Sequence, residues 1–165
     1  MGAHAGAPGW AVALEQSGYA TAMRQWLWLY PAVEIVHIVG IVLLVGAAAM
    51  FDLRLLGFSR GLPVRGMARH LLPWAWVGLG LVLVSGLSMF TAHATEWVTS
   101  NVFRLKAALI VVAGLNAAVF HRRSYRTVDR WNTGAVATPA ARVAAVISLV
   151  VWAAVITCGR LLAYF

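Results

Sequence analysis

The sequence is poor in cysteine and in charged side chains. Cys158 is the one cysteine among 165 residues, which excludes an internal disulfide and a zinc or iron–sulfur site built from cysteines. Asp, Glu, Lys and Arg together make up 11 % of the chain, against roughly 25 % in soluble domains. Because a soluble core needs polar surface to cover it, this composition excludes an ordinary soluble domain.

Sequence motifs of several common enzyme classes are absent as well. The chain has no Gly-rich phosphate loop, no HExxH zinc motif and no Ser/His/Asp arrangement, so nothing favours an NTPase or a hydrolase. Five acidic residues stand against thirteen Lys and Arg, a net charge of +8. No soluble basic domain carries this charge, so it does not indicate nucleic-acid binding.

Long apolar runs dominate what remains, since hydrophobic residues make up 62 % of the chain. Four runs approach the ~20 residues that a membrane-spanning helix needs; they lie at 31–53, 71–92, 103–121 and 140–163. The sequence therefore predicts an all-α integral membrane four-helix bundle, formed by residues 31–165. Residues 1–30 lack the basic start and apolar run of a signal peptide, and we expect them to form a short interfacial helix before the first span.

Several residues mark where the spans begin. Pro31 and Pro139 suit the first turn of a helix, where a missing N–H is tolerated, and Thr138 can cap the fourth span. Asn101 is the predicted N-cap of the third span. Pro73 is expected in the first turn of the second.

The basic residues predict the orientation in the membrane. Nine of the thirteen fall at the 1–2 and 3–4 connections: Arg54, Arg60, Arg65, Arg69, Arg122, Arg123, Arg126, Arg130 and Arg142. Basic loops stay in the cytoplasm, so we expect both of these loops inside and both termini outside.

Two apolar runs carry ionisable groups at both ends. One extends from His37 to Asp52 and the other from Lys106 to His121; each pair of end groups is separated by about 22 Å of helix. Because the first and third spans run parallel, His37 and Lys106 share an outer layer, and Asp52 and His121 share an inner layer with His70. Ionisable groups inside a membrane are functional-site candidates.

His37 is the leading candidate for binding a cofactor. An imidazole in a four-helix bundle suits an axial ligand of haem b, and Gly40, one turn away, allows close approach of a flat macrocycle or of another helix. A neutral histidine that donates to a backbone carbonyl or to Glu34 is the alternative. Lys106 and Arg160 could each pair with a propionate or an anionic substrate, or could extend to the lipid headgroups.

The inner layer allows two interpretations. Asp52, Arg54 and His121 suit a structural ion-pair cluster at the inner interface. Alternatively, His70 and His121 hold a second haem, because both lie near the same membrane boundary.

A copper site is a further hypothesis for the outer end of the second span. Met89 and His93 are four residues apart, and Cys158 could add a third soft ligand for Cu(I). The alternative is a methionine in packing and an exposed loop histidine.

Four polar residues within the apolar runs predict hydrogen bonds between helices. They are Ser85, Asn116, Ser148 and Thr157.

Residues 36–47, VHIVGIVLLVGA, resemble the first-helix motif of HemJ-type protoporphyrinogen oxidases, which are small four-helix membrane proteins. Residues 103–121, FRLKAALIVVAGLNAAVFH, resemble a run in the third helix of the same family. The essential histidine and lysine of the family fall on His37 and Lys106. The resemblance covers these two helices and implies haem binding and porphyrinogen oxidation.

Two other groups show a likeness. The copper-resistance-D membrane domain has a comparable four-helix plan with a histidine in an apolar helix. Small uncharacterised bacterial four-helix integral membrane proteins resemble the chain over most of residues 25–165, through YPAVEIVHIVG, FDLRLLG, the run of the third span and CGRLLAYF. This likeness implies a bacterial inner membrane and no particular activity.

The residues and resemblances together leave two kinds of function open. In one, the protein binds haem b and has a redox role, passing electrons to a quinone or another redox partner. Lys106, His93 or an open position would then complete the coordination of the iron. In the other, it is a cofactor-free accessory membrane protein, homo-oligomeric through its small-residue faces, or a copper-handling protein.

Overall fold

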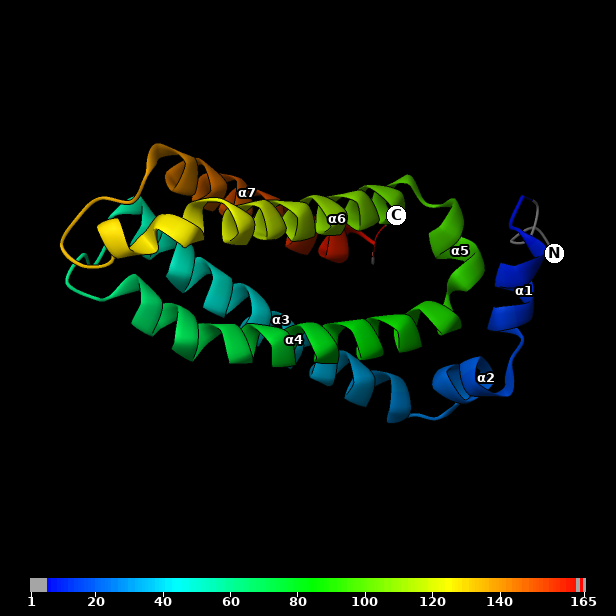
Figure 1. The fold of residues 1–165 in the computed structure, drawn as a ribbon. Coiled ribbons are helices and arrows are strands. Elements are labelled where there is room, and N and C mark those ends of the chain that lie inside the picture. Colours follow the sequence, from blue (N-terminus) through cyan, green and yellow to red (C-terminus); the bar gives the residue numbers. More distant parts are fainter. Residues whose placement is uncertain (1–5, 163, 165) are drawn as a thin grey trace.

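Long helices build the whole molecule. The computed structural model describes residues 6–162 and 164, and within them it contains helices and connecting turns and no strand. The long helices form an elongated bundle (Figure 1) and are α3 (Leu29–Leu56), α4 (Val64–Ala92), α6 (Asn101–Arg122) and α7 (Pro139–Leu161). Each is long and apolar enough to cross a membrane. The predicted all-α four-helix bundle is confirmed, and the chain is a multi-pass membrane protein.

The second span begins earlier than predicted. α4 starts at Val64, after Pro63 in extended conformation, instead of at residue 71. Pro73 therefore lies inside the helix and not in its first turn, so this prediction was wrong. The first two turns of α4 contain Arg65 and Arg69, and they bury Val64 and Ala68. Because the arginines interrupt the apolar run, the hydropathy of the sequence does not indicate where this helix begins.

The helix ends show one confirmed cap and one correction. The Thr138 hydroxyl accepts a hydrogen bond from Ala141 N at 3.3 Å, with Pro139 as the first helical residue, as predicted. α6 is capped by Ser100 and not by Asn101, because the Ser100 hydroxyl accepts from Phe103 N at 3.4 Å.

The N-terminal segment forms two short helices, α1 (Gly9–Glu15) and α2 (Gly18–Gln25), and not the single helix we expected. They lie at the end of the bundle opposite the α3–α4 and α6–α7 connections, which we call the outer end after its predicted orientation, and there α1 packs on α5 (Ala94–Thr99) (Figure 1). The Glu15 carboxylate accepts hydrogen bonds from Thr95 N at 2.8 Å and from Thr95 Oγ1 at 2.6 Å. These bonds satisfy the free N-terminus of α5.

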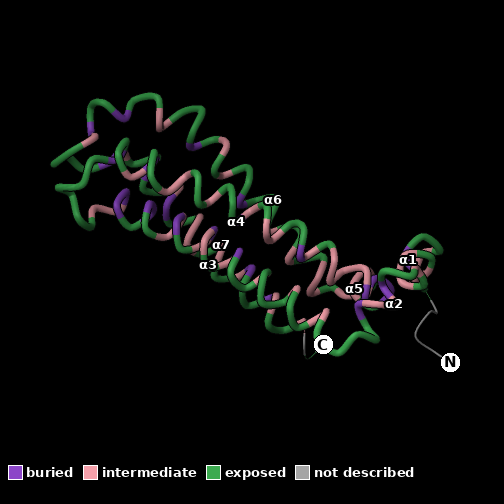
Figure 2. The backbone as a smooth tube through the Cα atoms, turned by 90° about the horizontal axis from the view of Figure 1, so that it is seen from below, coloured by how far each residue is buried: buried purple, intermediate pink, exposed green. Residues whose placement is uncertain are grey.

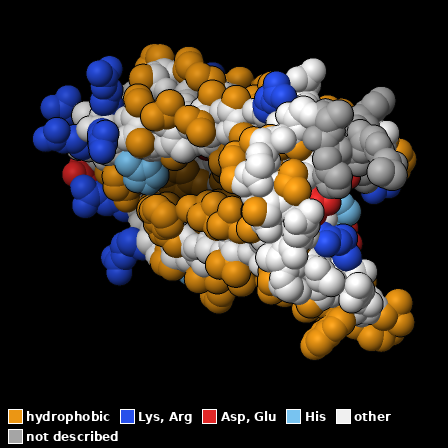
Figure 3. Space-filling model, turned by 90° about the vertical axis from the view of Figure 1, so that its right-hand side faces the viewer, with side chains coloured by type: hydrophobic (Ala, Val, Ile, Leu, Met, Phe, Trp, Pro, Cys, Tyr) orange, Lys and Arg blue, Asp and Glu red, His pale blue; other side chains and the backbone are white. Residues whose placement is uncertain are grey.

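The four long helices do not pack as a closed ring. α3 packs along α4 and α7, and α6 packs along α7, whereas α4 and α6 make few backbone contacts in the described part of the chain and meet through Phe90 and Phe103, whose rings stack with centroids 5.3 Å apart. Figure 2 shows most residues of the long helices exposed or partly exposed, as side chains that face lipid would be. Figure 3 shows one face hollowed between two apolar walls, with Lys and Arg gathered at one end.

The best-packed core lies at the arginine-rich end. Phe51 and Leu55 of α3, Val64 of α4 and Phe120 of α6 pack there with Trp131 of the α6–α7 connection. That connection contains a short 3₁₀ helix, η1 (Ser124–Arg130). The two arginine-rich connections therefore close this end of the bundle.

Candidate functional site

The outer half of the bundle brings together polar side chains from all four long helices. We call His37 of α3, Ser85 of α4, Lys106 of α6 and Cys158 of α7 the outer cluster. His37 Nδ1 lies 2.9 Å from Ser85 Oγ, and Lys106 lies within electrostatic range of both His37 and Cys158. The structure thus places His37 and Lys106 in one layer, as the register of the two apolar runs predicts.

The hydrogen bonds of Ser85 favour one tautomer of His37. The Ser85 hydroxyl has a single proton and donates it to the Leu81 carbonyl of its own helix. Its oxygen therefore accepts from Nδ1–H of His37, which leaves the lone pair on Nε2. This is the form of imidazole that binds a metal or accepts a proton. The alternative of a histidine that donates to a backbone carbonyl has support as well, because His37 also interacts with the Val82 backbone. No bond between His37 and Glu34 is recorded.

Gly40 serves helix packing and does not serve a cofactor. A Cβ atom at Gly40 would lie 2.9 Å from Leu81 Cβ and 2.9 Å from Val82 Cγ2. Of the two roles predicted for Gly40, close approach of another helix is therefore the one found, and α4 fills the place that a macrocycle would need.

Lys106 reaches the cluster along α7. Its Nζ would lie 3.4 Å from a Cβ atom at Gly159, so the missing side chain of Gly159 makes room for it. Lys106 and His37 are both half-buried although they lie between helices.

Arg160 is exposed, and its side chain lies toward the C-terminal end of its own helix, α7. Its Nη2 donates to Tyr164 Oη at 2.7 Å, and the guanidinium lies 5.0 Å from the centre of the Tyr164 ring. The structure records no contact between Arg160 and the outer cluster, so its predicted pairing with a bound anion stays a prediction.

Asp52, Arg54 and His121 do not form the ion-pair cluster proposed as one reading of the inner layer. Asp52 and Arg54 are two residues apart on α3, a spacing at which side chains do not face each other. Asp52 is 7 % exposed; the Ser148 hydroxyl of α7 interacts with its carboxyl, and Oδ2 has no hydrogen-bond partner. The exposed His121 places Nδ1 2.9 Å from Ala117 O of its own helix.

Arg54 instead ties the two arginine-rich connections together. Its side chain is 1 % exposed and donates to Leu62 O at 2.7 Å, Arg60 O at 3.1 Å and Asn132 O at 3.2 Å. The Asn132 side chain accepts from Arg65 N at 2.9 Å. Asn132 was not among the residues predicted to have a structural role. Its one signal in the sequence is that it is an uncharged polar residue after an arginine-rich stretch.

The structure does not bring His70 and His121 together as ligands of a second haem. Both are exposed, and the ring contacts of His121 are with Phe120 and Tyr125. No ring contact joins the two histidines, and the helices that carry them make few backbone contacts with each other.

The three residues of the copper hypothesis lie in different surroundings. His93 is 3.6 Å from the Glu96 carboxylate and stacks on Trp97, whereas Cys158 is buried beside Lys106. Among the residues that the structure describes, no group of three His, Cys, Asp or Glu side chains could hold a metal ion.

Three of the four predicted hydrogen bonds between helices are found and one was wrong; Ser148 of α7 interacts with Asp52 of α3, as described above. Ser85 bonds to His37, and Asn116 Nδ2 donates to Ala144 O of α7 at 2.9 Å. Thr157 donates to Ala153 O within its own helix.

The half-satisfied carboxyl of Asp52 gives a stability prediction. We expect Asp52→Asn to raise the thermal unfolding temperature in detergent, because the amide carries no charge that burial must desolvate. Asp129→Asn is the control: Asp129 is exposed and its ion pair with Arg65 contributes about 0–1 kcal/mol. A lower unfolding temperature for Asp52→Asn alone would show that the carboxylate is charged and stabilised in the folded protein.

The family resemblances around His37 and Lys106 stay predictions. No protein-family model, no curated protein and no solved structure matches this chain.

Proposed function

We propose that the protein binds haem b in the outer half of the bundle and has a redox role, with His37 as an axial ligand. The observation that carries this proposal is the His37–Ser85 hydrogen bond of 2.9 Å. A ligating histidine commonly donates its other N–H to a neighbouring group, which sets the tautomer and holds the ring in place. In this chain the Ser85 hydroxyl would set the tautomer of His37 and hold its ring in place, within an apolar helix.

Lys106 adds a positive charge to the site. It is the one basic side chain in electrostatic range of His37 among the described residues, and it can pair with a propionate carboxylate.

Bound haem would supply one-electron transfer to a quinone or another redox partner, as electron transfer or porphyrinogen oxidation requires. The residues of the chain would hold and orient the haem. His37 would bind the iron, Ser85 would fix the imidazole ring, and Lys106 would balance the negative charge of a propionate. The apolar walls exclude water, and exclusion of water strengthens each of these electrostatic contacts.

A difference spectrum of the purified protein tests the proposal. We expect the dithionite-reduced minus oxidised spectrum to show a b-type α band in the wild type and in His70→Ala, and no band in His37→Ala. His70→Ala is the matched control because His70 is an exposed histidine on another long helix. A colourless wild type from cells supplied with a haem precursor would reject the proposal and leave the cofactor-free and copper alternatives. A band that persists in His37→Ala would assign the iron to another ligand.

Ser85→Ala tests the positioning role of the hydroxyl. We expect this variant to keep the α band and to have a more positive midpoint potential, because an acceptor on Nδ1–H makes the imidazole a stronger donor to iron. Redox titration of the wild type and Ser85→Ala measures the difference. Equal potentials would mean that Ser85 has no influence on the metal.

A further inference from the structure

An apolar groove opens on the surface where the end of α3 meets the start of α7. Its volume is about 370 Å³, and it is lined by Leu56, Pro139, Arg142, Val143, Val146 and Ile147. Val143 and Val146 are about half exposed, and they lie on a helix that is apolar enough to span a membrane. The groove therefore faces lipid and extends from the arginine-rich end toward the middle of the span.

A single charged residue lies in the groove. Arg142 is exposed, and the structure records no hydrogen bond or ion pair of its guanidinium. At this end the exposed acidic side chain is Asp129, and it is already paired with Arg65 at 2.8 Å. The Lys and Arg side chains gathered at one end of the molecule (Figure 3) make this region positive, so an anion is favoured beside Arg142.

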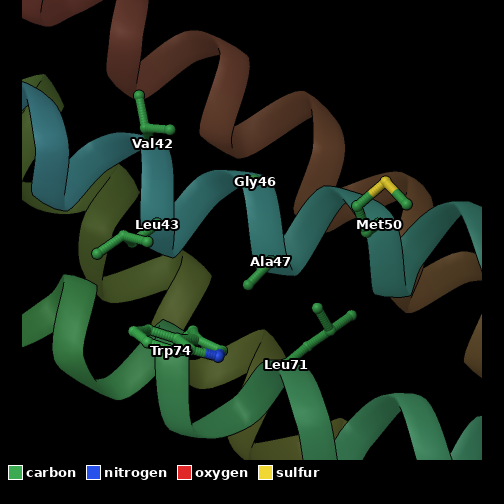
Figure 4. A pocket seen from close by; sticks show the side chains of 7 residues that line it. All are labelled: Val42, Leu43, Gly46, Ala47, Met50, Leu71 and Trp74. Carbon is green, nitrogen blue, oxygen red and sulfur yellow. The ribbon is translucent and has the colours of Figure 1, made fainter.

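A second groove provides an internal comparison. It lies between α3 and α4, has a similar volume of about 350 Å³, and is lined by Val42, Leu43, Gly46, Ala47, Met50, Leu71 and Trp74 (Figure 4). All of these residues are uncharged. The two grooves thus have similar size and apolar walls, and they differ in the presence of an arginine.

We propose that the α3–α7 groove is a binding site for an anionic phospholipid. One acyl chain lies along the apolar wall formed by Val143, Val146 and Ile147, and Arg142 pairs with the phosphate. Basic pockets at the cytoplasmic side of membrane helices bind anionic headgroups, and an arginine can contact phosphate through two N–H groups. The comparison groove, which has no cation, holds lipid chains without selecting their headgroup. The proposal does not depend on haem binding.

Lipid titrations with purified protein in detergent test the site. We expect phosphatidylglycerol to raise the unfolding temperature and to remain bound in native mass spectrometry at lower concentration than phosphatidylcholine. Arg142→Gln should lose about fivefold of this preference, equivalent to roughly 1 kcal/mol. Arg130→Gln removes the same charge from the same end, outside the groove lining, and should keep the preference.

Filling each groove separates the two sites. Val146→Trp places a large ring in the α3–α7 groove and should weaken binding of phosphatidylglycerol. Gly46→Leu fills the comparison groove, where a Cβ atom would have no neighbour within 4 Å, and should leave the headgroup preference unchanged. Size-exclusion chromatography confirms that each variant is folded.

Three results would overturn the proposal. Equal loss of preference in Arg142→Gln and Arg130→Gln would mean a diffuse charge effect. Equal binding of the two phospholipids by the wild type would mean no selection. Equal stabilisation by inorganic phosphate alone would mean an anion site without a lipid chain.

Discussion

Gly78→Ala is expected to cause a large loss of stability. A Cβ atom at Gly78 would lie 2.6 Å from Leu44 N and 2.8 Å from Gly40 O. Both are backbone atoms of α3, so the methyl group is accommodated only if α3 and α4 move apart. Overpacking costs about 1–3 kcal/mol even where side chains can adjust, and here no flexible side chain can. We expect the thermal unfolding temperature in detergent to fall sharply and the yield of monodisperse protein to drop.

Gly80→Ala is the matched control for this experiment. Gly80 lies two residues further along α4, and a Cβ atom there would have no neighbour within 4 Å. Since alanine favours helices over glycine by about 0.5–1 kcal/mol, this variant should be as stable as the wild type or slightly more stable. Equal unfolding temperatures for the two variants would contradict the close crossing of α3 and α4.

Arg54→Leu is the second substitution for which we expect a large effect. Three backbone carbonyls, from Leu62, Arg60 and Asn132, accept hydrogen bonds from this one buried guanidinium. A hydrogen bond to a charged group contributes about 1.5–3 kcal/mol, so the loss of three is expected to separate the α3–α4 connection from the α6–α7 connection. Unfolding temperature and limited proteolysis of the α6–α7 connection measure the effect.

Two further variants make this experiment specific. Arg54→Lys keeps the charge but replaces the planar fork with a single ammonium, and we expect intermediate stability. Arg65→Gln breaks an exposed ion pair at the same end, which contributes about 0–1 kcal/mol. If Arg54→Leu were as stable as Arg65→Gln, the two connections would be held together by the apolar core and by the backbone hydrogen bonds from Val64 N to Asn132 O and from Gly134 N to Arg60 O, and not by Arg54.

The sequence predicts the architecture well because the signal is long and repeated. Four apolar runs of membrane-spanning length leave few arrangements, and the positions of His37 and Lys106 in parallel spans predict that they share a layer. The caps formed by Thr138 and Pro139 are equally local and were found. Local signals were less certain where two neighbouring residues could each serve, since Ser100 and not Asn101 caps α6.

What the sequence does not reveal is which faces meet. Ser85 was correctly predicted to make a hydrogen bond between helices, but the sequence did not identify its partner His37, which is 48 residues away in the chain. Gly40 was equally consistent with a macrocycle or a helix, and only the distances to Leu81 and Val82 decide between them. The predicted cluster of Asp52 with Arg54 was wrong because closeness in sequence was taken for closeness in space.

The closed ends of the bundle have a consequence for how molecules arrive. The arginine-rich end is closed by its core, and α1, α2 and α5 lie at the outer end. We therefore expect a molecule that reaches His37 to enter sideways from the acyl chains and not from water. Such a route favours solutes that partition into the bilayer, where their local concentration is high and their search is two-dimensional. The bilayer then selects solutes by their solubility among the acyl chains, before they contact any side chain of the protein.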